Sequence, residues 1–225
     1  MKPYIISHMM MSVDGRIDCP MVAQISGEEY YTALDSFGTS SKISGRVTAA
    51  LECSAVAEET SGNGTGIGAE SVSKAVDSDE YTIVADTRGR LQMSCGNADG
   101  HPLLVVMSEL ASEEHLAMLR RNNVSWIATG KERIDLNRAV EIMAEQFGVK
   151  RLIIVGGGNI NGGFLEAGLV DEVSVMMAPG IDGRKGMTAV FDGCTWQADA
   201  PYKLHLKSVK QVEGTETIWV RYTCE

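Results

Sequence analysis

Three consecutive glycines, Gly156, Gly157 and Gly158, follow the apolar run RLIIV at residues 151–155 and precede a segment typical of a short helix. Without side chains, such a turn brings bare peptide N–H groups to the end of a buried strand. The helix that follows adds the positive end of its dipole, and the combination suits a pyrophosphate. The alternative is a tight strand-to-helix turn that binds nothing.

We predict that the peptide nitrogens of Gly156, Gly157, Gly158, Asn159 and Ile160 hold a nucleotide. Asn159 and Asn161 are expected to cap the helix. The G-x-G-x-x-G fingerprint is not met, because Asn161 stands where its third glycine belongs. An ordinary Rossmann NAD site is therefore not expected.

Asp14 is the candidate for proton transfer, because it lies in SVDGR just past the first apolar run. A partly buried carboxyl group at a sheet edge can have a raised pKa that suits it to donate a proton. The alternative is an Asp-Gly turn residue whose carboxylate accepts backbone hydrogen bonds. Arg16 is a candidate for a substrate phosphate, or else a solvated surface arginine.

The composition indicates a globular protein whose negative charge disfavours binding to polyanions. Its 225 residues are 44% hydrophobic and carry a formal charge of −10, which argues against nucleic acid and anionic membranes as partners. No apolar run reaches the roughly 20 residues of a membrane span, and the N-terminus lacks a signal-peptide cleavage site, so a cytoplasmic protein is expected. The five cysteines are scattered, and the four histidines lack ligand spacing, so no metal is predicted. His115 is expected on the surface of a helix.

Strand and helix patterns alternate along the chain, which is typical of parallel crossover units. The C-terminal segments KLHLKSV and TIWVRYT alternate apolar and polar residues around Gly214 and predict an antiparallel hairpin. The fold class is therefore α/β with a mixed sheet. The predicted strands are 4–11, 81–86, 102–107, 124–129 and 151–155, and the predicted helices are 26–37, 112–121 and 135–147.

Local signals support these assignments. Ser26 and Glu29 have capping-box spacing, and Ser112 is the expected N-cap of a helix with acids in its first turn and arginines in its last. Only EETSGNGTGIGAE, residues 58–70, reads as a mobile insertion, because its glycines and small polar residues bury little area. Residues 1–225 are predicted to form a single domain.

Several segments, in order, resemble the reductase domain of bacterial and archaeal riboflavin biosynthesis, which shares the dihydrofolate reductase fold. KPYIISHMMMSVDGRI is similar to the family's first strand and S-x-D-G-[KR] turn, and SGRVT at residues 44–48 to its G-R-x-T nucleotide segment. IVADTRGRL at residues 83–91 resembles the D-x-x-G-R-L strand end. The stretch RLIIVGGGNINGGFLEAGLVDEVSVMMAPGIDG is the most specific of these matches.

The resemblance implies a three-layer α/β fold around a mixed, mostly parallel sheet, NADPH as the hydride donor and a homodimer. It favours Asp14 as the catalytic residue, with Ser12 and Arg16 at the substrate. The 2′-phosphate of NADPH needs fixed donors, and arginine's planar fork suits it. The remaining candidate cofactor-binding residues are Gly45, Arg46, Thr48, Thr87, Arg88, Ser108 and Gly130.

Two features depart from the family pattern. Val155 stands where the family usually has a glutamate before the glycines, and the D-P-x-L-T substrate segment is absent. The zinc deaminase module that is often fused to such reductases is also missing. We therefore expect an NADPH-dependent reductase of a small heterocyclic or ribosylamino substrate, most like 5-amino-6-(5-phosphoribosylamino)uracil reductase. A dihydrofolate or dihydropterin reductase and a nucleotide-binding module without turnover remain the alternatives.

Overall fold

The computed structural model describes residues 2–61, 64–194 and 201–224. The chain forms two compact units, each built from two separate stretches of sequence. The central unit comprises Met1–Pro3 and Thr39–Leu152, and the flanking unit comprises Tyr4–Gly38 and Ile153–Glu225. The expectation of a single domain over residues 1–225 stays a prediction.

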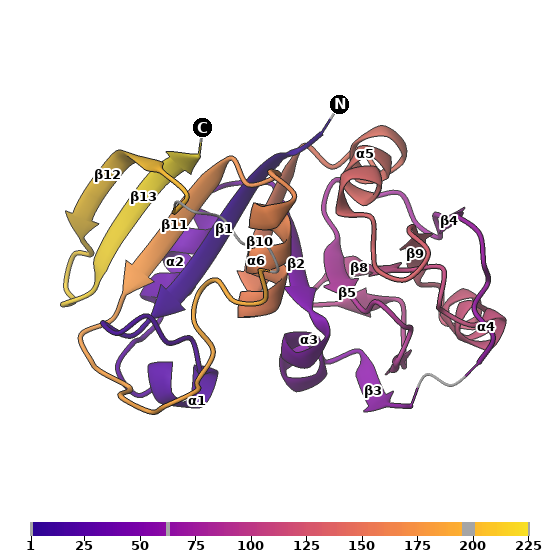
Figure 1. The fold of residues 1–225 in the computed structure, drawn as a ribbon, viewed down its shortest axis with the longest axis horizontal. Coiled ribbons are helices and arrows are strands. Elements are labelled where there is room, and N and C mark those ends of the chain that lie inside the picture. Colours follow the sequence, from indigo (N-terminus) through magenta and orange to yellow (C-terminus); the bar gives the residue numbers. More distant parts are fainter. Residues whose placement is uncertain (1, 62–63, 195–200, 225) are drawn as a thin grey trace. The chain divides into compact units, whose positions relative to one another are not determined.

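The flanking unit contains strands in the order β12-β13-β11-β1-β10 (Figure 1). Strands β1 and β11 pair in parallel, whereas β11–β13 and β12–β13 pair antiparallel. The strands are β1 (Tyr4–Met11), β10 (Arg151–Gly156), β11 (Glu172–Met177), β12 (Leu204–Gln211) and β13 (Ile218–Cys224), and the helices are α1 (Cys19–Val22), α2 (Glu29–Asp35) and α6 (Gly158–Glu166).

The central unit has the strand order β2-β5-β8-β9-β4, in which β2, β5, β8 and β9 run parallel and β4 is antiparallel to β9. A short strand β7 pairs with β8, and β3 forms a separate ladder with β6. The strands are β2 (Ser41–Gly45), β3 (Val56–Glu59), β4 (Ser71–Ser73), β5 (Thr82–Ala85), β6 (Leu91–Met93), β7 (Asn97–Ala98), β8 (His101–Met107) and β9 (Ser125–Ala128).

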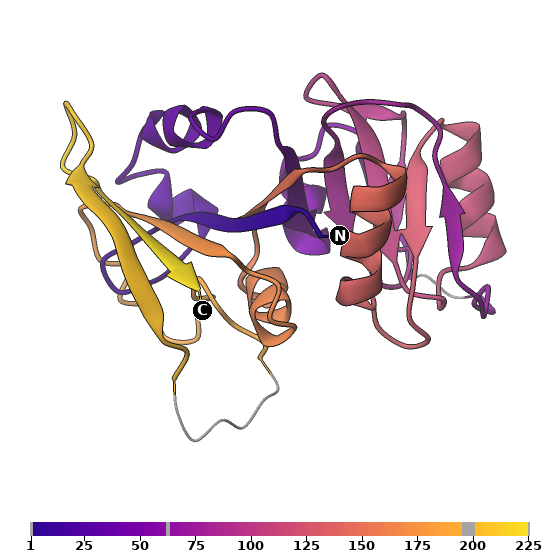
Figure 2. The same ribbon diagram turned by 90° about the horizontal axis from the view of Figure 1, so that it is seen from above.

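Helices cover both faces of the central sheet, which explains its continuous apolar strands. Residues 103–107 of β8 are all fully buried. Val105 and Met107 share a core with Leu116 and Leu119 of α4 (Glu113–Arg121). Figure 2 shows α5 (Leu136–Gln146) on the other side of these strands, and α3 (Arg46–Glu52) is the unit's third helix.

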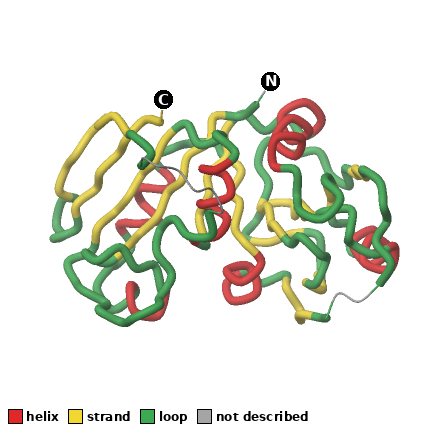
Figure 3. Tube along the Cα trace, viewed as in Figure 1, coloured by secondary structure: helices red, strands yellow, loops and turns green. Residues whose placement is uncertain are grey.

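The structure confirms the mixed, mostly parallel α/β fold and its C-terminal antiparallel hairpin. The predicted segments all contain the expected strand or helix, with ends that differ by a few residues (Figure 3). Ser112 caps α4 by accepting a hydrogen bond from the His115 N–H, as expected. None of the helices in the described residues is long and apolar enough to span a membrane.

The capping box expected at the start of α2 is wrong. The Ser26 hydroxyl donates backwards to the Val22 carbonyl, 2.9 Å away, and the N-cap is Glu28. The Glu29 carboxylate instead accepts hydrogen bonds from the Gly27 N–H and the Thr217 hydroxyl. No described side chain caps the first turn of α2, and Glu29 instead joins the helix start to Thr217.

The described part of residues 58–70 is not the unstructured insertion that the sequence predicted. Residues 58–59 end strand β3, and the Ile67 and Gly68 N–H groups donate to the Ala111 and Glu109 carbonyls. A Cβ on Gly66 would lie 2.5 Å from the Glu109 carbonyl oxygen, so glycine permits this close packing. Residues 62–63 of the predicted insertion lie outside the described residues.

Candidate active site

In the central unit, the carboxyl ends of four neighbouring parallel strands carry most of its predicted cofactor-binding residues. Strands β2, β5, β8 and β9 end at Gly45, Ala85, Met107 and Ala128. Ligands of open α/β sheets bind beyond this edge of the sheet. The residues at or just beyond it are Gly45, Arg46, Thr87, Arg88, Ser108 and Gly130, and Thr48 follows within α3.

Hydrogen bonds join these strand ends. The Ser108 N–H and hydroxyl both donate to the Thr87 carbonyl, at 3.0 and 2.6 Å, and the Glu109 N–H donates to the Gly130 carbonyl at 2.8 Å. Gly130 has φ +81°, and a Cβ there would lie 2.2 Å from the Arg133 carbonyl oxygen. Gly130 is thus required by its own loop, and the Ser108 hydroxyl already has an acceptor.

A tight turn after β5 is held by Asp86, which the sequence analysis did not single out. One oxygen of the fully buried Asp86 carboxylate accepts the Arg90 and Leu91 N–H groups, at 2.5 and 2.7 Å. Gly89 has φ +64° and lies against the ring of His115. His115 is only 4% exposed, so the prediction of a surface histidine is wrong, and burial lowers its pKa.

The two arginines predicted for the cofactor phosphate differ in surroundings. Arg46 forms an ion pair with Glu59 of β3, and the same carboxylate lies 4.0 Å from Arg90. Arg88 occupies the exposed part of the turn between Asp86 and Gly89. Arg90 and Glu59 were missed, although Arg90 is the arginine of the quoted D-x-x-G-R-L segment.

In the flanking unit, the turn after β1 brings Ser12, Asp14 and Arg16 together. The buried Ser12 hydroxyl donates to Asp14 Oδ1 at 2.6 Å and accepts the Arg16 N–H at 3.1 Å. The Asp182 N–H donates to Oδ1 and the Gly183 N–H to Oδ2 of Asp14, both at 3.0 Å. Asp14 therefore ties the turn to the segment that follows β11.

These hydrogen bonds determine the charge of Asp14. The Ser12 hydroxyl and the Gly183 and Asp182 N–H groups lower the pKa of this exposed carboxyl to about 2. The expectation of a buried carboxyl with a raised pKa is wrong, because the group is exposed and each of its hydrogen bonds stabilises the ionised form. Asp14 is a carboxylate at neutral pH and acts as an acceptor.

Arg16 is directed towards the protein's own backbone. Its Nη1 donates to the Met187 carbonyl at 2.6 Å, and its backbone forms a bridge with Ala189. The Nε of Arg16 is buried and has no partner among the described residues. The Arg16 side chain thus supports the segment of residues 187–189, and its buried Nε is a donor with unused capacity.

Helix α6 begins at the glycine triplet with an uncapped N-terminus. Its N-cap is Gly157, with φ +94° and ψ 122°, and no described side chain accepts a hydrogen bond from its first turn. The first N–H groups of a helix have no partner within the helix. The peptide nitrogens of Gly158, Asn159 and Ile160 are therefore available to an anionic ligand, which fits the pyrophosphate of a dinucleotide.

Asn159 and Asn161 do not cap this helix, which corrects the prediction. The fully buried Asn161 donates to the Val190 carbonyl at 2.7 Å and accepts the Ser7 hydroxyl at 3.1 Å. Gly158 and Gly162 admit the segment of residues 189–192, since a Cβ on either would lie within 2.3 Å of a carbonyl oxygen there. Asn159 is exposed beside Gly193.

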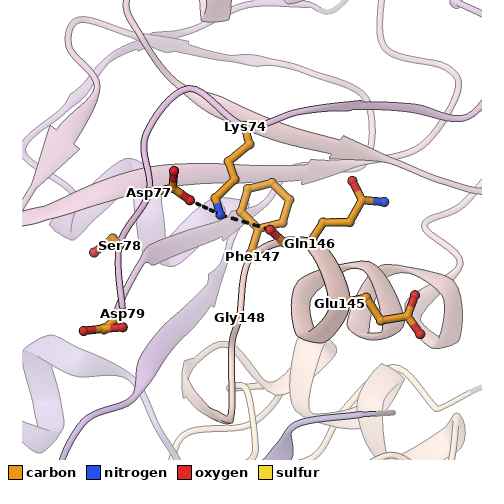
Figure 4. A pocket seen from close by; sticks show the side chains of 8 residues that line it. All are labelled: Lys74, Asp77, Ser78, Asp79, Glu145, Gln146, Phe147 and Gly148. Carbon is orange, nitrogen blue, oxygen red and sulfur yellow. Dashed lines mark hydrogen bonds and ion pairs between the residues drawn. The ribbon is translucent and has the colours of Figure 1, made fainter.

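A shallow surface pocket of the central unit is lined by none of the predicted site residues (Figure 4). Lys74 crosses it with Nζ 5.7 Å from the centre of the Phe147 ring. The ammonium group forms an ion pair with Asp77 and donates to the Gln146 carbonyl at 3.0 Å. The Lys74 ammonium group therefore already has an anionic partner and a carbonyl acceptor within the protein.

The predicted site residues therefore form two sets. Gly45, Arg46, Thr48, Thr87, Arg88, Ser108 and Gly130 belong to the central unit, and Ser12, Asp14, Arg16 and residues 156–160 belong to the flanking unit. Each set lies beyond the carboxyl ends of strands of its own unit.

Two proteins of similar sequence carry the same name. A 2,5-diamino-6-ribosylamino-4(3H)-pyrimidinone 5′-phosphate reductase of Methanothermobacter thermautotrophicus is 28% identical over 198 residues, covering 86% of this chain and 85% of that protein. A protein of the same name from Archaeoglobus fulgidus is 30% identical over 113 residues, covering 49% of this chain and 50% of that protein.

Solved structures share the fold. A pyrimidine reductase-like protein of Corynebacterium diphtheriae has a TM-score of 0.73 at 14% identity, covering 99% of this chain and 92% of that chain. Acinetobacter baumannii RibD has a TM-score of 0.71 at 18% identity, covering 100% of this chain and 58% of that chain. The model of the RibD C-terminal domain family matches residues 3–218. The chain therefore belongs to the RibD C-terminal domain family, as its sequence predicted.

Proposed function

We propose that this protein is an NADPH-dependent reductase that converts a ribosylamino-pyrimidine 5′-phosphate to its ribityl form in riboflavin biosynthesis. The observation that carries the proposal is the match to the Methanothermobacter reductase along most of both chains. Two relatives are named for the 2,5-diamino-pyrimidinone, which makes this compound the first substrate to test, before the aminouracil.

The residues present fit a nicotinamide dinucleotide. In the flanking unit, the uncapped N-terminus of α6 would take a pyrophosphate. In the central unit, Arg46 and Arg88 follow the ends of β2 and β5 and would take a phosphate group such as the 2′-phosphate. When bound, NADPH supplies the hydride for the imine carbon. The protein must orient the substrate and allow a proton to reach the heteroatom.

Asp14 contributes to this reaction as an acceptor. Its Oδ2 accepts one hydrogen bond, from Gly183, and a carboxylate oxygen accepts at least two. The exposed Oδ2 can therefore hold a hydroxyl or amino group of the substrate, beside Ser12 and Arg16. Because the pKa of Asp14 is about 2, the proton comes from water or from the substrate itself.

Oxidation of NADPH, followed by the absorbance of reduced nicotinamide, tests the function. The assay compares the 2,5-diamino-pyrimidinone phosphate, the 5-amino-uracil phosphate, dihydrofolate and a blank without substrate, each with NADPH and NADH. We expect turnover with a pyrimidine phosphate and a preference for NADPH. Turnover with dihydrofolate alone would show that the protein is a dihydrofolate reductase. Binding of NADPH without consumption of any compound would show that it is a nucleotide-binding module without turnover.

We also propose that the protein is a cytoplasmic homodimer. The edge strand β12 is exposed along its whole length and displays Leu206 and Val209, which are 61% and 58% exposed. Exposed strands and contiguous apolar side chains are usual contact surfaces between subunits. Sedimentation equilibrium tests the dimer. Leu206→Lys should shift it to monomer, whereas a wild-type monomer at micromolar concentration would refute the proposal.

A further inference from the structure

In the flanking unit, the loop of residues 181–186 after β11 is held by carboxylates. The Asp182 and Gly183 N–H groups donate to Asp14, both at 3.0 Å. The next N–H group, of Arg184, donates to the Asp182 side chain at 3.2 Å. None of residues 181–186 forms a backbone–backbone hydrogen bond with another described residue. The position of this loop, and of the N–H groups on Asp14, therefore depends on side chains.

Arg184 joins the loop to the turn that carries Asp14. Its Nε and Nη2 donate to the two carboxylate oxygens of Asp182, at 2.6 and 2.7 Å. Its Nη2 also donates to Asp18 Oδ2, and Asp18 lies four residues after Asp14 on the turn after β1. Arg184 thus bridges the same two chain segments that Asp14 joins.

The guanidinium group of Arg184 also compensates the negative charge of this region. The side chains of Asp182 and Asp18 are 1% and 19% exposed, whereas that of Arg184 is 43% exposed. A carboxylate that is removed from water is costly without its cation. Hydrogen bonds from Arg184 lower the pKa of Asp182, and the negative charge of Asp14 opposes this shift. Asp14 and Asp182 therefore repel each other, and Arg184 offsets the repulsion.

We propose that Arg184 is a positioning residue, which keeps the N–H groups of the loop on Asp14 by holding Asp182 and Asp18 together. The inference rests on the proposed function, in which the exposed Oδ2 of Asp14 accepts a hydroxyl or amino group of the substrate. Arg184 acts through Asp14 and does not itself contact the substrate.

The other arginine near Asp14 does not take over this role. Arg16 donates its Nη1 to the Met187 carbonyl, so that its guanidinium group is directed to a different part of the segment after β11. Loss of Arg184 therefore leaves the loop with Asp14 as its remaining anchor to the turn, and leaves the charge of Asp182 uncompensated beside it.

Carbon-13 NMR of the Asp14 carboxyl group tests this role without any turnover, with the signal assigned by its absence in Asp14→Asn. In the wild type the signal should stay constant between pH 7 and pH 4, because the pKa is about 2. In Arg184→Ala the loss of fixed N–H donors and the charge of Asp182 both raise the pKa towards the ordinary 3.8, so the signal should move over this range. Lys185→Ala removes the neighbouring exposed cation and is the matched control, in which the signal should stay constant.

Asp18→Asn is a milder variant that decides the question if Arg184→Ala does not fold. It weakens only the bridge to the turn and leaves the bidentate contact between Arg184 and Asp182 in place. The Asp14 signal should then move in the same direction as in Arg184→Ala, by a smaller amount.

Steady-state kinetics with the pyrimidine phosphate adds a second measurement. Arg184→Ala should lower kcat by about 10-fold, because a displaced acceptor orients the substrate poorly, and should change the affinity for NADPH by less than about 2-fold. Arg184→Lys should restore part of kcat, since an ammonium group keeps the charge but lacks the planar fork that reaches two carboxylates. Lys185→Ala should keep the wild-type kcat.

The two measurements separate the outcomes. An Asp14 signal that stays constant in Arg184→Ala, or that moves as much in Lys185→Ala, would overturn the proposal. A constant signal together with a raised KM for the substrate would instead make Arg184 a direct ligand of the substrate. An inactive protein whose Asp14 signal moves as expected loses only the proposed reaction, and an active enzyme whose signal stays constant loses this inference alone.

Discussion

The hydroxyl of Ser12 donates a 2.6 Å hydrogen bond to the Asp14 carboxylate, which also accepts two backbone N–H groups from residues 168 and 169 positions further along the chain. A surface aspartate is thereby converted into a fixed acceptor whose pKa is about 2. This carboxylate joins the turn after β1 to the segment after β11, beside a backbone hydrogen bond from the Val13 N–H to the Gly180 carbonyl.

Asp14→Asn should lower turnover by about 10-fold or more while the affinity for NADPH is kept, because the amide cannot accept hydrogen bonds at both positions. The rate profiles of wild type and variant between pH 5 and 8 should have the same shape, since the wild-type carboxylate stays ionised throughout. Steady-state kinetics across this range checks both points. If the wild-type rate changed with pH in this range and the change were lost in Asp14→Asn, Asp14 would be the proton donor after all.

Asn161→Ala should lower the free energy of unfolding by about 2–3 kcal/mol, because it leaves the buried Ser7 hydroxyl and the Val190 carbonyl without a partner. Asn159→Ala, at an exposed position two residues earlier, should change it by less than about 0.5 kcal/mol. Urea unfolding measures both. Equal effects of the two substitutions would show that Asn161 contributes no more than a surface residue.

His8 should make the stability depend on pH. It is fully buried, stacks on Tyr30 and contacts the Ser174 hydroxyl at 2.9 Å, and burial lowers its pKa from 6.5 to about 4. The unfolded chain binds the proton more tightly than the native protein does, so stability is present above pH 6.5 and is lost as the pH falls towards 4. From these values, the free energy of unfolding should drop by about 2 kcal/mol between pH 7 and pH 5.

Urea unfolding of His8→Phe at both pH values checks this contribution. The variant keeps an aromatic ring against Tyr30 and removes the titrating group. The drop should become smaller but not vanish, because buried His115, whose pKa is also lowered, acts in the same direction. His205→Phe on the exposed strand β12 is the control, and an unchanged drop in His8→Phe would reject the assignment.

Gly157→Val should weaken NADPH binding at least 10-fold, because a side chain there holds a phosphate away from the N–H groups of α6. The residue also has φ +94°, so the substitution strains the backbone. Gly148→Val is the matched control for strain, with φ +71° and open space around its Cβ position. Both variants should lose about 1–2 kcal/mol of stability, but only Gly157→Val should lose affinity in calorimetry. Normal affinity of Gly157→Val for NADPH would show that the glycine triplet is only a strand-to-helix turn.

The sequence by itself predicted what depends on neighbours along the chain. Some signals involve only a few consecutive residues, and the structure confirms them. They are the apolar run of β1, the Ser112 cap of α4 with its acids and arginines, and the alternating residues of the C-terminal hairpin. The glycine triplet was recognised for the same reason. A strand that ends in Gly-Gly-Gly before a helix offers no side chain of its own to cap that helix, and none of the described side chains caps α6.

Only the tertiary structure decided properties that arise from residues distant in sequence. The charge of Asp14 depends on N–H groups at positions 182 and 183, and the role of Asn161 on Ser7 and Val190. The link between Arg46 and Arg90 depends on Glu59, which a ladder between β3 and β6 brings to them. Burial, pKa and ion pairing are set by whatever the fold packs around a group, so a residue's own sequence context does not reveal them.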